Sequence, residues 1–164
     1  MKTSKRAGGF PAGTRLQCCD GMIPVEFLDV GDRVISRDVG TVWIEQISPI
    51  VVDTHFIRFQ SHALHEKSPV VEVLLPHDQL VLVRNWRARE IFWADRALVE
   101  AKDLVDHLLV EMTEKRKDVV FQITFSAPHI VYLEGIEVGS ADAIPTRINA
   151  RHPTAVEAPQ HVSR

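Results

Sequence analysis

The sequence lacks the features that mark several large classes of protein. Its 164 residues include two cysteines, the neighbours Cys18 and Cys19, and adjacent cysteines make a strained disulfide, so we expect no disulfide framework. No window approaches the roughly 18 to 20 uninterrupted apolar residues of a membrane helix, and the basic N-terminus has no apolar signal region. We therefore expect a cytoplasmic protein with no membrane partner.

An excess of charge of one sign is also lacking. The 19 basic and 22 acidic residues give a net charge of -3, which provides no field for phosphates, so we expect no nucleic-acid partner. No P-loop or dinucleotide-binding glycine pattern occurs, and no cofactor is predicted. His62 and His65 are spaced as H-x-x-H, but without cysteine or carboxylate partners at ligand spacing they predict no metal site.

What the sequence does contain is a series of short β-rich runs separated by turn signals. Runs at 70–75 and 79–84 are near-continuously apolar, as in strands buried on both faces. The other expected strands lie at 14–19, 22–28, 33–37, 41–52, 119–126 and 129–138. This spacing predicts one all-β domain in which a folded-over or closed sheet buries the apolar runs.

Two segments depart from this pattern. Within residues 91–112, apolar residues spaced by three and four predict a short helix or helical turn; they are Leu98, Ala101, Leu104, Val105 and Leu108. From about Ala143 the sequence loses periodicity and gains proline. We therefore expect a domain at 8–142, with flexible termini at 1–7 and 143–164.

A specific motif occupies the first part of the domain. The pattern F-x-A-G-T-x-L, followed by D-G-x-x-P-V-E-x-L-x-x-G-D-x-V-x-x-R, runs from Phe10 to Arg37. It resembles the first half of a Hint domain, the hedgehog and intein self-processing module, and in particular a bacterial branch. The segments LPHDQLVLVRNWRA and HIVYLEGIEVGSA resemble later blocks of that branch. The resemblance covers about residues 9 to 142 and implies a Hint-like fold, whereas activity depends on the site itself.

The chemistry that this resemblance implies is autocatalytic peptide-bond cleavage through an N–S acyl shift. A cysteine at the start of the domain attacks the preceding carbonyl and forms a thioester. Alignment on Phe10 places Gly9 at the nucleophile position and Gly8 before it, so the attacking thiol is missing. Cys18 and Cys19 end the predicted strand 14–19, which rises roughly 3.3 Å per residue, so we expect them at the end far from Gly9.

The other family positions are altered as well. The central block normally supplies a histidine that polarises the scissile amide, usually with a threonine three residues earlier. Here His77 and Asp78 stand where the branch tends to have Asp then His, and residue 74 is leucine. In a strand, a displacement by one residue would point His77 away from the site unless a bulge compensates. His129 is a candidate for a late histidine, or else a partly buried residue at a strand entry.

The candidate vestigial site therefore comprises Gly9, His77, Asp78 and His129. Three hypotheses follow. The favoured one is a Hint-like module without activity that serves as a structural or binding module. The second is an enzyme that cleaves near residue 9 without cysteine, by water attack assisted by His77 or His129. The third is a protein-binding or homodimeric module that uses an aromatic and arginine patch. The patch comprises Trp86, Arg87, Phe92 and Trp93. These residues can equally be strand anchors beside a solvated edge.

Overall fold

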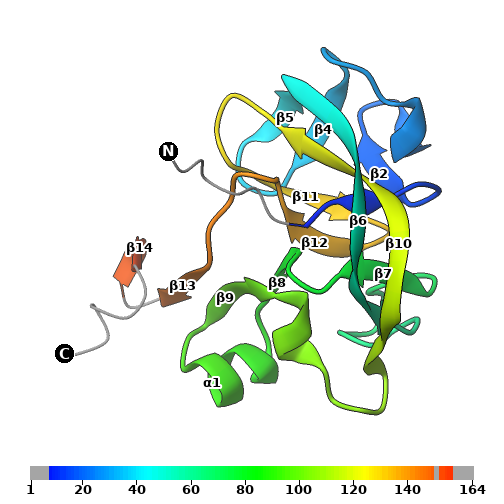
Figure 1. Ribbon diagram of the computed structural model, residues 1–164. Helices are drawn as coiled ribbons and strands as arrows, with labels where there is room; N and C mark the ends of the chain where they lie inside the picture. The colour runs from blue at the N-terminus through cyan, green and yellow to red at the C-terminus, as the bar shows by residue number, and fades with distance from the viewer. Residues whose placement is uncertain (1–7, 150–151, 157–164) are drawn as a thin grey trace, which may run out of the picture.

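The computed structural model describes residues 8–149 and 152–156, and their backbone forms two β-sheets (Figure 1). The expected all-β class is confirmed. The first sheet has four strands in the order β1-β10-β6-β7. Their bounds are β1 Phe10–Pro11, β10 Val110–Thr124, β6 Gln46–Phe59 and β7 Val73–Pro76.

The second sheet has ten strands in the order β14-β13-β9-β8-β12-β11-β2-β4-β5, with β3 paired to β2. The bounds are β2 Arg15–Cys18, β3 Gly21–Pro24, β4 Arg33–Ser36, β5 Gly40–Trp43, β8 Leu80–Val83, β9 Arg96–Glu100, β11 Ile130–Leu133, β12 Ile136–Gly139, β13 Thr146–Asn149 and β14 His152–Val156. Short 3₁₀ turns lie at Val25–Phe27 and Ala101–Leu104. Among the described residues, the strand pairings in both sheets are antiparallel.

Strands β6 and β10 form a long curved ribbon that crosses the molecule (Figure 1). Their register runs from Val110 opposite Phe59 to Thr124 opposite Gln46, with an irregularity between Met112 and Lys115. The polar tract TEKRKD, residues 113–118, lies inside β10, whereas the sequence predicts that a strand begins only at residue 119. The tract extends because its backbone pairs with β6, while its charged side chains remain largely exposed.

The apolar runs form the core as expected. All four residues of β8 are buried, as are Val73 and Leu75 of β7. Val70 and Val71, at the start of the same apolar run, lie outside the strand and are exposed. The main core cluster joins both sheets and includes the fully buried Phe59 and Leu16.

The helix lies earlier than the sequence spacing predicts. Helix α1 spans Trp86–Phe92 and begins after Asn85, whose side chain accepts a hydrogen bond from the Arg87 N–H. Leu98, expected in the helix, lies instead in β9, and Ala101 begins a 3₁₀ turn. Pairing of β9 with β8 and β13 outweighs the helical spacing of its apolar residues.

Part of the expected C-terminal tail is folded. Strand β13 pairs with β9, with Thr146 opposite Leu98 and Ile148 opposite Arg96, and β14 pairs with β13. Backbone pairing at the free edge of β9 orders this segment although its sequence has little periodicity. The predicted flexible segment 1–7 lies outside the described residues, and the domain boundary at 142 stays a prediction.

Candidate functional site

The segment Gly8–Gly9 immediately precedes β1 and lies in a narrow buried passage. Both residues are buried, with φ values of 73° and 136°. A Cβ on Gly8 would meet the Gln79 side chain at 2.3 Å and backbone at 2.7 Å, and one on Gly9 would lie 2.5 Å from the Val120 Cγ2. Positive φ and missing space both require glycine at these two positions.

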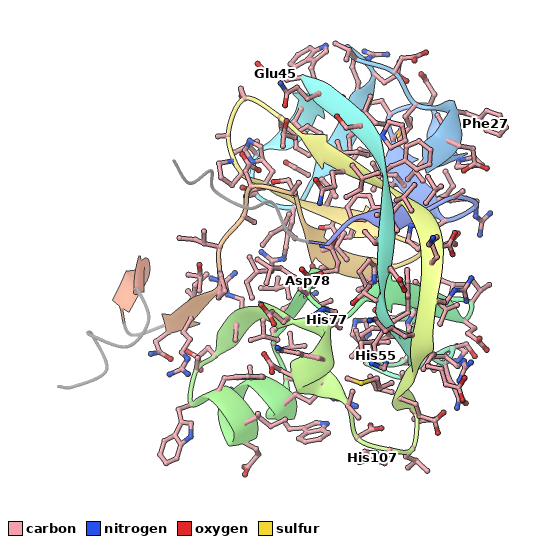
Figure 2. The ribbon with its side chains drawn as sticks, in the orientation of Figure 1. Phe27, Glu45, His55, His77, Asp78 and His107 are labelled. Atoms are coloured by element: carbon pink, nitrogen blue, oxygen red, sulfur yellow. The ribbon has the colours of Figure 1, made fainter. Side chains whose placement is uncertain are left out.

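Residues 77–79 form the turn between β7 and β8 that faces this segment. The turn is closed by the Gln79 N–H, which donates to the Pro76 carbonyl over 3.0 Å. Asp78 Oδ1 accepts a hydrogen bond from the Gly8 N–H over 3.2 Å. Figure 2 shows Asp78 and His77 between the β-ribbon and the lower part of the second sheet. A tight turn, rather than a strand, thus presents the central block to the N-terminal segment.

The Gly8–Gly9 peptide bond is held at both of its polar atoms. Gln79 Oε1 accepts a hydrogen bond from the Gly9 N–H over 2.8 Å, and Gln122 Nε2 donates to the Gly8 carbonyl over 3.1 Å. Gln79 is 2% exposed, and its Nε2 donates to the Gly139 and Leu80 carbonyls over 2.9 and 3.0 Å. The amide of Gln79 is therefore fixed in the orientation that accepts from Gly9.

These contacts polarise a peptide without supplying a reaction. A donor on the carbonyl oxygen stabilises negative charge there, as in an oxyanion hole. A glutamine oxygen that accepts the amide hydrogen has no proton to give to a leaving nitrogen, unlike an imidazolium. Because Gly9 carries no side chain, the position contributes no nucleophile. Sequence reasoning missed Gln79 and Gln122, and the only available signal was the position of Gln79 directly after His77 and Asp78.

His77 is part of the same turn but is not a polar contact of the peptide. Its N–H donates to the His55 carbonyl, and its own carbonyl accepts from the Lys102 N–H. The N–H groups of Gly8 and Gly9 donate instead to the side chains of the two residues that follow His77. We expected His77 to point away from the site because side chains alternate along a strand. That reason is wrong, because residues 77–79 form a turn.

His129 makes its polar contacts elsewhere. Its Nδ1 lies 2.9 Å from Asp38 Oδ2, its N–H donates to Ser140 Oγ, and its ring packs edge-on against Phe125. The imidazole is 11% exposed and precedes β11, as a residue at a strand entry would. The structure thus places Asp78 against Gly8, the residue before Gly9, and gives His129 a separate partner in Asp38.

Neither cysteine hydrogen-bonds the Gly8–Gly9 peptide among the described residues. Cys18 ends β2 and is buried; burial, with the nearby charges of Asp32, Cys19 and Asp20, raises the pKa of its thiol to about 11. Cys19 is exposed, with Sγ 3.5 Å from Thr41 Oγ1. A thiol with a raised pKa is a poor source of thiolate at neutral pH.

The expected contact patch is split by the fold. Trp86 and Trp93 are 57% and 81% exposed. Arg87 is buried, donating to the carbonyls of Leu64 and Ala63, and Phe92 packs against the core. Of these four residues, the two tryptophans therefore present the large exposed surfaces. Trp86 begins α1 and Trp93 follows its last residue, so neither lies on a strand.

The described part of the chain contains neither a candidate metal cluster nor a candidate membrane-spanning helix. No cluster of three or more His, Cys, Asp or Glu side chains there is arranged to hold a metal ion. None of the helices in that part is long and apolar enough to cross a membrane.

The family follows from the sequence together with this fold. Residues 8–143 match the family model described as "Hint domain", which covers most of the chain. The chain belongs to the Hint-domain family. The match begins at Gly8, so the glycine pair lies at the start of the family domain. No curated protein matches the sequence.

Solved structures agree with the Hint fold. A bacterial intein-like domain from Clostridium thermocellum is 14% identical, with a TM-score of 0.53, and the match covers 85% of this chain and 100% of that one. A DnaB intein from Synechocystis sp. PCC 6803 is 7% identical, with a TM-score of 0.55, covering 84% of this chain and 100% of that one. At such identities the likeness shows the fold alone.

Proposed function

We propose that this Hint domain does not cleave its chain through a thioester and acts as a structural or binding module. One observation carries the proposal: the Gly8–Gly9 peptide is buried between Gln79 and Gln122, and the position at the junction has no side chain. A polarised peptide without an attacking atom is inert toward acyl transfer.

The surroundings of the glycines strengthen this proposal. A lost catalytic side chain could leave a site otherwise unchanged, but here Gln79 and Val120 occupy the space that a Cβ would need. The backbone conformation also suits glycine and few other residues. The site is therefore adapted to hold a glycine pair, and a simple return of cysteine would disturb it.

The direct test is a fusion with a reporter protein placed before residue 1. The purified fusion is incubated with and without dithiothreitol or hydroxylamine, and its intact mass is measured. We expect the full mass in every sample. Thiol-dependent release of the reporter would refute the proposal, and C18S and C19S variants of the fusion would then identify the cysteine responsible.

A second candidate, cleavage near residue 9 by water, is favoured by one contact. Asp78 Oδ1 lies 3.2 Å from the Gly8 nitrogen, and a carboxylate there could act as a general base for water. This route predicts slow cleavage without added thiol. A D78N substitution abolishes that cleavage, and D53N, on β6 opposite Lys117, leaves it unchanged. An unchanged precursor mass over days, from mildly acidic to mildly alkaline pH, would exclude it.

A third candidate, self-association through α1, is favoured by the exposure of Trp86 and Trp93. Aromatic side chains of this kind often anchor interfaces. Light scattering at two protein concentrations would show a dimer that W93E dissociates. The matched control is W43E, since Trp43 is also 57% exposed but lies on β5. A monomer at both concentrations would exclude this candidate.

A further inference from the structure

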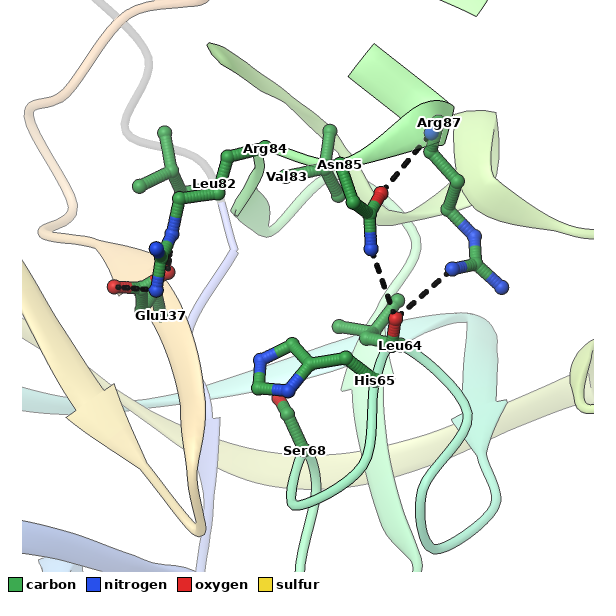
Figure 3. A pocket seen from close by; sticks show the side chains of 9 residues that line it. All are labelled: Leu64, His65, Ser68, Leu82, Val83, Arg84, Asn85, Arg87 and Glu137. Atoms are coloured by element: carbon green, nitrogen blue, oxygen red, sulfur yellow. Dashed lines mark hydrogen bonds and ion pairs between the residues drawn. The ribbon is translucent and has the colours of Figure 1, made fainter. Parts of the chain in front are cut away.

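A cavity lined by polar and apolar residues lies at the end of β8 that is far from the glycine pair. Gln79 immediately precedes this strand, and Arg84 and Asn85 immediately follow it. The cavity has a volume of about 220 Å³ and an apolar wall formed by Leu64, Leu82 and Val83 (Figure 3). It opens between the end of β8 and the loop 64–68.

Hydrogen bonds fix the walls of this cavity. The Leu64 carbonyl accepts from both Asn85 Nδ2 and Arg87 Nη1, over 3.2 and 3.0 Å. Ser68 Oγ donates to the Gly135 carbonyl over 2.8 Å. These bonds join the loop 64–68 to α1 and to the β11–β12 turn. The cavity is therefore a formed feature of the fold and not a gap between loose side chains.

The charges around the cavity do not balance. Arg84 and Arg37 both pair with the single carboxylate of Glu137, over 3.1 and 2.9 Å. Arg87, which also lines the cavity, lies 3.8 Å from Asp106. Three guanidinium groups thus face two carboxylates in these ion pairs, which leaves one positive charge in excess. Glu137 is 9% exposed and Arg84 is 47% exposed, so water reaches the Arg84 side chain and screens part of this excess.

Arg84 and His65 line the cavity and have hydrogen-bonding atoms that the described residues do not use. Arg84 uses Nε and Nη2 on Glu137, and its Nη1 makes no hydrogen bond with the described residues. The ring of His65 likewise makes no hydrogen bond in that part of the chain. Figure 3 shows Arg84 on one side of the space, Asn85 on the other and His65 between them. A ligand in the cavity could accept from Arg84 and contact the apolar wall together.

We propose that this cavity binds a small organic carboxylate with an apolar body. The carboxylate accepts from Arg84 and offsets the excess positive charge, and the apolar body rests on Leu82 and Val83. The cavity is smaller than the roughly 300 to 1,000 Å³ of sites for drug-sized ligands, which limits the ligand to about ten heavy atoms. This site is independent of the proposed loss of cleavage at the glycine pair.

The test is titration of the full chain with 4-methylpentanoate, with 4-methylpentanamide as the neutral analogue, followed by NMR. We expect the carboxylate to shift the Arg84 Nε–H signal and the backbone amides of 64–68 and 82–87, with little response to the amide. If both compounds give the same shifts, or neither shifts these signals, the proposal is wrong.

A matched pair of variants assigns the recognition to Arg84. R84Q should weaken binding by roughly tenfold or more, because a charge-assisted hydrogen bond is lost. R89Q is the control, since Arg89 lies on α1, is 74% exposed and does not line the cavity. Equal affinity in R84Q and R89Q would overturn the assignment. Because half of the Arg84 side chain is exposed, we expect R84Q to keep the fold.

Discussion

Replacement of Gly9 by alanine tests whether the site is adapted to glycine. The added Cβ would lie 2.5 Å from Val120 Cγ2 and 2.9 Å from Val120 Cβ, contacts that real Cβ atoms do not make. The φ of 136° would also be strained for any residue with a Cβ. Both effects act on the folded state, so G9A should lower the free energy of unfolding.

The magnitude follows from these two contributions. A non-glycine residue in a sparsely populated backbone region costs about 1 to 3 kcal/mol, and overpacking of a filled core costs about 1 to 3 kcal/mol. Together they give about 2 to 6 kcal/mol, a large part of the roughly 5 to 15 kcal/mol that stabilises a typical domain. Gly13 separates the two effects, because its φ is 91° and a Cβ there would meet nothing within 4 Å.

Urea denaturation of the wild type, G9A and G13A measures these costs. We expect G9A to lose at least about 1 kcal/mol more than G13A, since only G9A adds the steric contribution. V120A should restore part of the loss in the double variant, with a coupling energy of about 0.5 to 3 kcal/mol. If G9A costs no more than G13A and shows no coupling to V120A, the reasoning about Gly9 is refuted.

Two further predictions concern groups away from the glycine pair. Burial by itself raises the pKa of Asp106, but the backbone N–H donors of residues 108–110 and the charge of Arg87 outweigh burial and lower the pKa. The ionised Asp106 carboxylate therefore stabilises the folded state above the unfolded pKa of about 3.9. This stabilisation is lost as pH falls through the folded pKa. D106N should lower the unfolding free energy at neutral pH and lower it less in acid, whereas an equal loss at both pH values would contradict this. Iodoacetamide at mildly alkaline pH should add one group to the native protein, at Cys19, and two in urea, because burial protects Cys18 and raises its pKa to about 11; rapid native modification of Cys18, seen by peptide mass mapping, would be the contrary result.

The fold was largely predictable because its turns and strands have local signals. Turn residues such as Gly21 and apolar runs such as 80–83 mark elements whose conformation depends on nearby residues. The helix was misplaced because Leu98 and its neighbours are spaced like one face of a helix, although they pair in β9. Strand β13 was missed because its order depends on the edge of β9, which is 45 or more residues away.

The site was predictable only in what it lacks. The missing thiol at Gly9 follows directly from the aligned motif. The partners of the peptide do not, since Gln122 lies 114 residues from Gly8 and only the pairing of β1 with β10 brings them together. The family pattern points to a histidine in this block, whereas the turn presents Gln79, two positions after His77, to the Gly9 N–H.

The central claim is that the polarised Gly8–Gly9 peptide undergoes no acyl transfer. Intact mass spectrometry of the reporter fusion after prolonged incubation with hydroxylamine tests it most directly, because hydroxylamine captures any thioester or ester that forms. A single species at the full precursor mass is the predicted result. A reporter that ends at Gly8 with a hydroxamate on its carboxyl terminus would contradict the account.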